Sequence, residues 1–363
     1  MALLMGYFTN LRSLKNAQLY PGPYTYPGPN TWMVHNGYSL SRKQRLIIRK
    51  LSFPGLYPIS ELKGAISNFS LSASTQKTVK MQASFDYRGN DLSDADVISI
   101  SVHLDNGFEQ EEVRIATMKV CRSGGSNGTF KVSCYGLTKY LADDRFFEPY
   151  SVSKGSDPFD VIEDILSSVN LRVAIRPPES NTIRTNKSYL PEEFTKLEIV
   201  NDLLDNAGYL AADTNEYGLV TFRTTVKTPK YSSIVFSEGQ ASIIQRDYEL
   251  EQDWEDIANV VIVTCNNADD EVLRAIAVND SLFDPTSTAF RGEVVRVESM
   301  SDADSQAVID AKAADLLSEE RSRLEAITFK CAYRPLLLFD HVRLKIDDID
   351  AVYTVQNYEL DET

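Results

Sequence analysis

The sequence has few of the residues that build disulfide frameworks or metal sites. Its 363 residues include only three histidines, which lie far apart, and four cysteines. No C-x-x-C pair occurs among the cysteines, which are Cys121, Cys134, Cys265 and Cys331. These absences argue against a disulfide scaffold and against a zinc site built from closely spaced ligands. The composition fits a chain that folds in a reducing cytoplasm.

Long apolar runs are also missing. The runs at Val260–Val263 and Leu336–Phe339 are short, whereas a membrane-spanning helix needs about 20 apolar residues. Residues 1–14 lack the basic stretch, apolar core and cleavage site of a secretory signal. The sequence therefore predicts neither a membrane span nor secretion. The length predicts two or three domains with enough core to fold without metals.

Familiar catalytic motifs are absent as well. No nucleophile elbow, zinc-protease, phosphate-loop or dinucleotide-binding pattern occurs. The glycine run at 124–128 falls between two predicted strands, which favours a hairpin loop over a phosphate site. Acidic groups at 269–271 and 347–350 lack the spacing of a calcium-binding loop and predict solvated turns. A chance carboxylate pair among 52 acidic residues leaves glycoside hydrolysis open. The sequence points to no catalytic residue, cofactor or metal.

Charge of one sign dominates the chain. Asp and Glu number 52 against 37 Lys and Arg, giving a net charge of -15. Since phosphate contacts need a basic surface, conventional nucleic-acid binding is disfavoured. One segment is an exception, because residues 42–50 hold five basic side chains and no acid. Upstream, residues 20–29 read YPGPYTYPGP, and prolines bar that stretch from a helix or a central strand.

These two segments predict that residues 1–54 form an extended N-terminal arm. The simplest interpretation is a solvated terminus. The alternative is that the aromatic and basic side chains dock on an acidic neighbouring subunit. The candidate subunit-interface residues are Arg42, Lys43, Arg45, Arg49, Lys50 and Trp32.

Alternating apolar and polar residues mark the region 55–150 as β structure. Odd positions from Val79 to Tyr87 are apolar and even positions are polar, and a second alternation runs from Ile98 to Leu104. Turn signals occur at Arg88–Asp91 and Asp105–Gly107. Strands of this length separated by turns predict an antiparallel sandwich or barrel.

The pattern then changes twice. Residues 151–230 predict a small α/β module, in which Asp157 caps a first helix, a second helix follows Pro191, and a hairpin surrounds 213–218. Residues 231–363 return to strands, including Val260–Val263 as a strand buried on both faces. Within this region, 302–324 predicts one long helix whose small residues suit packing on a sheet.

The succession of these elements resembles the tail hub (baseplate hub) proteins of tailed bacteriophages, which are related to the hubs of contractile injection systems. The matching stretches, in order, are 62–66, 79–87 and 92–100, then 129–141, then 157–166, 196–209 and 218–222, and finally 302–324, 333–344 and 353–360. The likeness covers about residues 55–360. Asp340 lacks the glycine that often precedes it in the family, and residues 1–50 have no counterpart.

The resemblance implies an α+β, mostly antiparallel β fold with two tube-like β-barrel domains, at 55–150 and 231–363. The α/β module at 151–230 would lie between them, and helix 302–324 would pack on the second barrel. It also implies a structural virion protein, not an enzyme, that forms a homotrimeric ring. The ring would join the tail tube or a distal tail protein to a tip, spike or tape-measure protein. DNA would pass through without specific binding, and the particle would assemble in the host cytoplasm.

Two other classes of function remain open from the sequence. One is a tail-tip enzyme, such as a peptidoglycan hydrolase or peptidase. The other is a receptor-binding or carbohydrate-binding β protein, with loops at 105–109, 123–128 and 279–291 as its contacts. An acidic channel surface would suit the passage of DNA, although net negative charge also serves solubility.

Overall fold

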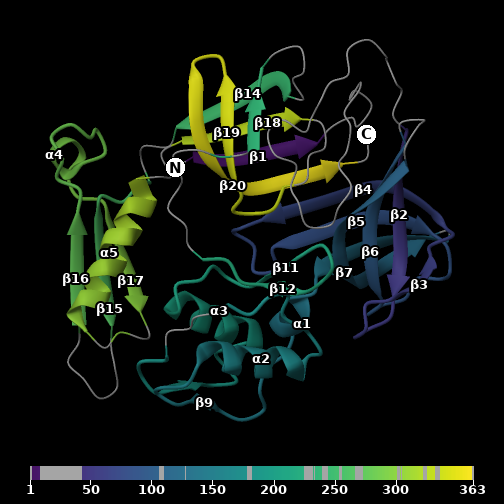
Figure 1. Ribbon diagram of the computed structural model, residues 1–363, viewed down its shortest axis with the longest axis horizontal. Coiled ribbons are helices and arrows are strands. Elements are labelled where there is room, and N and C mark those ends of the chain that lie inside the picture. The colour runs from purple at the N-terminus through teal and green to yellow at the C-terminus, as the bar shows by residue number, and fades with distance from the viewer. Residues whose placement is uncertain are drawn as a thin grey trace.

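The computed structural model describes residues 2–8, 43–105, 110–126, 128–177, 182–224, 232, 234–238, 244–252, 256–265, 273–300, 303, 305–321, 325–331 and 336–361. Three parts are visible in Figure 1: a large sheet, an α/β module below it, and a small sheet with its helices at one end of the long axis. Among the helices in these ranges, none is both long and apolar enough to cross a membrane.

The first half of the large sheet is antiparallel and contains the predicted alternating strands. Met81, Ala83, Phe85 and Tyr87 are buried while the residues between them are half-buried, so the predicted alternation is confirmed. The order of its strands is β4-β5-β8-β7-β6-β2-β3. Their bounds are β2 (Lys43–Leu51), β3 (Pro58–Glu61), β4 (Ala65–Ser74), β5 (Met81–Arg88), β6 (Val97–Asp105), β7 (Gln110–Ser126) and β8 (Thr129–Gly136).

The glycine run lies at the hairpin between β7 and β8, as predicted, although β7 takes in the first part of the run. β7 continues to Ser126, with an irregularity between Arg122 and Gly125, and Gly125 pairs with Phe130 of β8. A Cβ atom on Gly125 would lie 1.9 Å from the carbonyl oxygen of Thr129. Only glycine therefore fits this close approach of two backbones.

The second half of the sheet is built from both ends of the chain. Its strands are β1 (Ala2–Phe8), β13 (Ile234–Ser237), β14 (Ile244–Gln252), β18 (Glu325–Cys331), β19 (His341–Ile346) and β20 (Ile349–Asp361). β20 pairs with β4 from Asn357 opposite Ser74 to Asp361 opposite Ser70. This seam joins the halves into one 13-stranded sheet, and one hydrophobic core runs through both halves. Among the described strands no closed barrel is found, so the two barrels stay a prediction.

The structure differs from the predicted arm at both of its ends. β1 lies parallel to and between β18 and β20, and β2 pairs with β6 along its whole length. β2 packs in the sheet because apolar residues stand among its basic ones, and of these Ile47, Ile48 and Leu51 are buried. Residues 9–42 lie outside the described ranges.

The α/β module has its own core under two capped helices. Asp157 accepts a hydrogen bond from the backbone N–H of Phe159 at 2.9 Å, and Thr195 forms a capping box with Glu198. Both predicted helices are confirmed, and Val173 forms an isolated bridge with Val220. The bounds are α1 (Lys139–Ala142), β9 (Tyr150–Val152), α2 (Pro158–Ser168), β10 (Lys187–Tyr189), α3 (Lys196–Asn206), β11 (Asp213–Thr214) and β12 (Val220–Thr221).

The long helix does not pack on the large sheet, so that prediction is wrong. α5 (Gln306–Arg321) covers a separate sheet in the order β16-β15-β17 (Figure 1). Its small residues suit a sheet, but they do not specify which one. The bounds of the other elements are β15 (Val260–Cys265), β16 (Leu273–Val278), α4 (Thr288–Arg291) and β17 (Val295–Met300).

The prediction that Val260–Val263 is buried on both faces is only partly right, because Val260 is buried on the face away from α5 but Ile262 on that face is half-buried. Val261, Val263 and Cys265 lie in a core with Ile309, Ala313 and Leu316 of α5. Ile262 and Thr264, on the opposite face, are only half-buried. A continuous apolar run is typical of a strand that other elements cover on both faces. Among the described residues of this chain, α5 covers one face of β15 and no element covers the other face completely.

Candidate functional site

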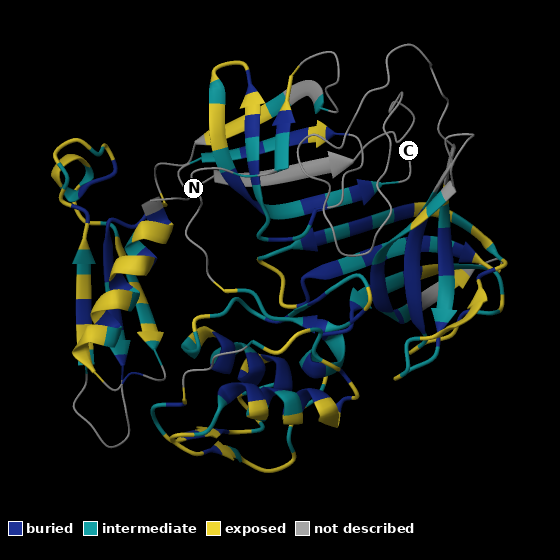
Figure 2. Ribbon diagram, viewed as in Figure 1, coloured by how far each residue is buried: buried dark blue, intermediate teal, exposed yellow. Residues whose placement is uncertain are grey.

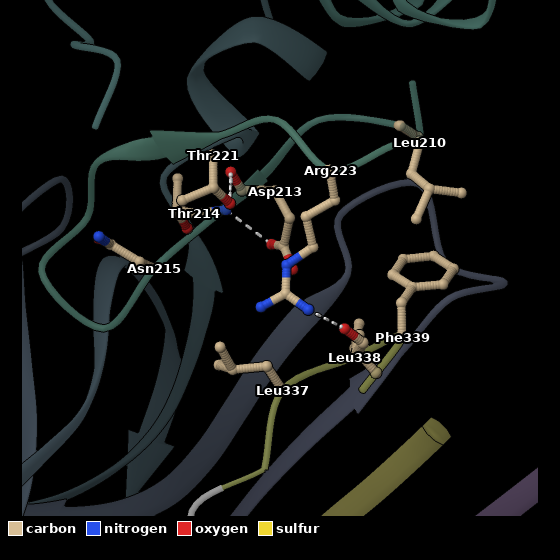
Figure 3. A pocket seen from close by; sticks show the side chains of 10 residues that line it. Leu210, Asp213, Thr214, Asn215, Thr221, Arg223, Leu337, Leu338 and Phe339 are labelled. Carbon is tan, nitrogen blue, oxygen red and sulfur yellow. Dashed lines mark hydrogen bonds between the residues drawn. The ribbon is translucent and has the colours of Figure 1, made fainter. Parts of the chain in front are cut away.

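A small cavity marks the point where the α/β module meets both halves of the large sheet. Its walls come from the module between Leu210 and Arg223 and from Leu337–Phe339, which lead into β19 (Figure 3). Lys80, in the turn before β5 of the first half, lies above the ring of Phe339, with Nζ 5.8 Å from the ring centroid. Three segments that are remote in sequence therefore meet at one place.

Arg223 connects the module to the second half of the sheet. Its Nη1 donates to the carbonyl oxygen of Leu338 at 2.8 Å and to Oδ1 of Asp340 at 3.2 Å. Asp340 also accepts from the backbone N–H of Leu337 at 2.8 Å through Oδ2. The guanidinium points between Leu338 and Asp213 (Figure 3). Paired charges of this kind hold two units in a fixed orientation, because removing one partner leaves the other charge unpaired.

Burial shifts the protonation of the acids at this junction. Loss of solvation raises the pKa of Asp213 to about 6, although a hydrogen bond from the N–H of Thr214 and the charges of Lys80 and Arg223 act in the opposite direction. Burial likewise raises the pKa of Asp340. Burial has the opposite effect on basic groups, because it also disfavours their charged form, and it therefore lowers the pKa of Lys80 and of His341.

The dimensions of this cavity favour a structural contact between the module and the sheet over an active site. Its volume is about 40 Å³, which holds a few water molecules at most. Pockets that bind small-molecule substrates measure about 300–1,000 Å³. Perturbed carboxyl pKa values also arise in structural ion-pair networks. We therefore interpret the Arg223–Asp340 pair, with Asp213 beside it, as a structural clamp.

A second cavity, of about 180 Å³, lies between the module and the turn after β2. Arg114 of β7 lines it, with its guanidinium 5.4 Å from the ring of Tyr217, and Nη2 donates to Oγ1 of Thr117 at 2.8 Å. Thr117 Oγ1 in turn donates to the carbonyl oxygen of Glu216 at 2.6 Å. Burial lowers the pKa of Arg114, and its Nε is buried without a hydrogen-bond partner. This cavity too is a contact between module and sheet.

Inside the module, two buried lysines are neutralised by acids. Nζ of Lys187 lies 2.6 Å from Oδ2 of Asp202, which also accepts from the Tyr189 hydroxyl at 2.6 Å. Nζ of Lys196 lies 2.7 Å from Oδ2 of Asp144. These pairs explain how the module tolerates buried charge.

The predicted interface residues form internal contacts where the structure describes them. Arg45 pairs with Glu61 at 3.0 Å, Arg49 pairs bidentately with Glu112, and Lys50 pairs with Asp96 at 2.7 Å. The Arg45 side chain nevertheless stays 66% exposed. Lys43 lies in β2 opposite Asp105, while Trp32 and Arg42 lie outside the described ranges. The structure does not bring the described members together as a free basic patch, and their role at an interface stays a prediction.

Nothing in the sequence singles out Asp213, Arg223 or Arg114. Each is a lone charged residue in or beside a strand, and only the packing of distant segments gives it a role. In the described ranges, no three His, Cys, Asp or Glu side chains are placed to hold a metal ion.

Two solved structures that share this fold are tail proteins. A tail protein from Neisseria meningitidis MC58 aligns with a TM-score of 0.60 over 87% of this chain and 91% of its own, at 14% identity. The 43 kDa tail protein of prophage MuSo2 from Shewanella oneidensis aligns with a TM-score of 0.60 over 88% of this chain and 95% of its own, at 9% identity. No protein-family model matches the sequence, and no curated protein matches it significantly.

The fold of this chain is therefore that of phage tail proteins, as the resemblance in the sequence predicted. At these identities the likeness extends to the fold alone. It spans nearly nine-tenths of the chain.

Proposed function

We propose that this protein is a structural component of a phage-type tail, and specifically the hub that joins the tail tube to the tail tip or spike. The observation that carries the proposal is the shared fold over 87% of this chain and 91% of a tail protein. A likeness restricted to one sheet would fit many β proteins, whereas the full succession of units is far more restrictive.

The arrangement of the large sheet supports a ring. The two halves of the sheet meet at the seam between β20 and β4, so each copy would offer two β units side by side. Three copies would then supply six units around a central channel, matching a sixfold tube. A homotrimer with one barrel-like unit per half is the assembly that we propose.

The charge of the chain supports the passage of DNA without binding. Duplex DNA carries one negative charge per roughly 1.7 Å of its axis, and this chain carries a net charge of -15. Repulsion between like charges keeps DNA from adhering to the channel wall. We propose no enzymatic step, since the two cavities described above serve as contacts between units.

The proposal is tested by the mass and symmetry of the purified protein. Native mass spectrometry and electron microscopy of the full chain are expected to give a discrete trimeric ring with an open channel. A monomer at high protein concentration would overturn the proposal. Soluble fragments released from purified peptidoglycan would instead support a tail-tip enzyme.

A further inference from the structure

The cavity of about 180 Å³ between the α/β module and the large sheet is lined by two arginines, and we call it the arginine cavity. Arg114 reaches it from β7, and Arg172 reaches it from the segment after α2. The rest of its lining comes from residues 53–56, 170–171 and 217–219, and the described residues that line it include no Asp or Glu. In a chain with 52 acidic and 37 basic residues, such a lining favours an anion as the occupant.

Arg114 is held in a fixed position, but no described acid forms an ion pair with it. Its Nη2 donates to Oγ1 of Thr117 at 2.8 Å, and its guanidinium carbon lies 5.4 Å from the centroid of the Tyr217 ring. The bond to Thr117 is the one hydrogen bond that the guanidinium makes with a described residue, although each of its nitrogens can donate. Nε is buried without a partner. A partly buried cation without a counter-ion is costly, and a bound anion removes that cost.

Two carboxylates of the chain lie near Arg114 without pairing with it. Burial lowers the pKa of Arg114 and outweighs the charges of Glu216 and Glu112, which act to raise it. Arg49 already holds both carboxylate oxygens of Glu112. Glu216 is engaged through its backbone, since its carbonyl oxygen accepts from the Thr117 hydroxyl at 2.6 Å, and it does not line the cavity. Among the described residues, no acid therefore fills the position beside the guanidinium of Arg114.

One wall of the arginine cavity is a tightly packed hairpin. The hairpin between β11 and β12 lies so close to the sheet that a Cβ atom on Gly218 would be 2.8 Å from Cδ1 of Leu137 and 2.9 Å from Cγ2 of Thr117. All residues from 209 to 223 except Tyr217 are buried or half-buried, at the place where the module meets the large sheet in Figure 2. This wall is therefore formed before any ligand binds.

Arg172 joins the module to the turn after β2. Its carbonyl oxygen accepts from the N–H of Val220 at 2.8 Å, and its Nη2 donates to the carbonyl oxygen of Pro54 at 3.3 Å. Arg172 is exposed and has no ion pair with a described acid. Its charge is therefore available to a ligand that enters from solvent. A preformed cavity with apolar walls and a few convergent polar groups is the usual form of a binding site.

We propose that the arginine cavity binds a carboxylate carried on a small apolar body, with the carboxylate paired to Arg114 and the apolar part against Leu56 and Leu171. Guanidinium and carboxylate groups are both planar, so two parallel hydrogen bonds can join them. The volume lies below the about 300–1,000 Å³ of pockets for larger ligands, which limits the occupant to one small group. The carboxylate belongs either to a free small acid or to the end of a neighbouring polypeptide chain. In both cases the ligand bridges β7 and the module.

Isothermal titration calorimetry of the full chain with sodium benzoate tests this site. Benzoate should bind at one site, and benzamide, which has nearly the same shape but no charge, should bind about tenfold more weakly or worse. Arg114→Gln should reduce the affinity for benzoate about tenfold or more. Arg172→Gln should reduce it several-fold, because it removes the second positive charge of the cavity.

The matched control is Arg145→Gln. Like Arg172, Arg145 is exposed and donates to the carbonyl oxygen of a proline, Pro191 at 2.7 Å, but it does not line the cavity. Its replacement should leave the affinity for benzoate unchanged. Thermal melting followed by circular dichroism checks that each variant is folded, and the exposed position of Arg172 keeps the test decisive should Arg114→Gln fail to fold.

N-acetylleucine, which represents the end of a polypeptide chain, distinguishes the two sources of the carboxylate. Tighter binding of N-acetylleucine than of benzoate would identify a neighbouring chain as the source, and the reverse order would identify a free acid. The site would be overturned by equal affinities for benzoate and benzamide, by equal affinities of the Arg172→Gln and Arg145→Gln variants for benzoate, or by no binding of benzoate to the wild type. Each of these results would leave the proposed hub function standing, since that function is tested by the mass and symmetry of the ring.

Discussion

Replacing Asp213 by asparagine should stabilise the protein at neutral and alkaline pH. Burial raises the pKa of this carboxyl from 3.8 to about 6, so the folded state binds its proton more tightly than the unfolded state does. The protonated form therefore contributes stability that is fully present below about pH 4 and is lost as the pH rises through 6. Asparagine keeps the acceptor for the N–H of Thr214 and has no proton to lose.

The size of this stabilisation follows from the shift in the pKa of Asp213. A rise of about two pKa units corresponds to about 3 kcal/mol, and the partial exposure of Asp213 reduces this to about 1–2 kcal/mol. The measurement is the urea midpoint of unfolding of wild type and Asp213→Asn from pH 4 to pH 8. We expect the variant to be more stable at pH 8 and the difference to vanish near pH 4.

A variant with the opposite sign serves as the control. Arg343 holds both carboxylate oxygens of Asp350, at 2.6 and 2.8 Å, and lowers the pKa of Asp350. Its contribution is therefore present at neutral pH and lost on acidification. Asp350→Asn should destabilise the protein at pH 7 and lose its effect toward pH 3. If Asp213→Asn behaves in the same way, the attraction of Lys80 and Arg223 outweighs burial, and the argument for Asp213 is refuted.

Three further substitutions test the local structure. Asp157→Ala removes the cap of α2 and should cost about 1 kcal/mol in unfolding free energy, measured by urea titration. Gly125→Ala places a Cβ against the Thr129 carbonyl and should lower the melting temperature by several degrees, whereas Gly155→Ala, where a Cβ meets no neighbour, reports the backbone strain alone. Arg49→Glu faces Glu112 and Glu61 and should destabilise folding more than Arg45→Glu does; equal effects would contradict the internal role of Arg49.

The sequence predicted those elements whose signals are local. The alternation of 79–87 matches β5, and the predicted cap at Asp157 begins α2. In each case a few neighbouring residues suffice, since a strand needs one apolar face and a helix needs a cap and a stripe. The resemblance to tail proteins could likewise be recognised from the sequence, because it depends only on the order of the elements along the chain.

Long-range partners were not predictable in the same way. β1 lies between β18 and β20, more than 300 residues further along the chain, and nothing in residues 2–8 specifies those neighbours. The small residues of α5 indicated packing on a sheet, but two sheets were available. The clamp at Arg223 depends on Leu338 and Asp340, over 100 residues away, so its signal is a property of the packing and not of any short motif.

The placement of buried charge fits a scaffold better than a catalyst. A catalytic group with a shifted pKa must reach a substrate, and so lies in a pocket large enough to admit one. Here Asp213 and Asp340 border a cavity of about 40 Å³, and Arg223 uses its donors on the neighbouring unit. Charges buried in this way resist a change of orientation between module and sheet, because any movement exposes an unpaired partner. The hub ring that we propose would need that resistance, because it would link a tube to a tip.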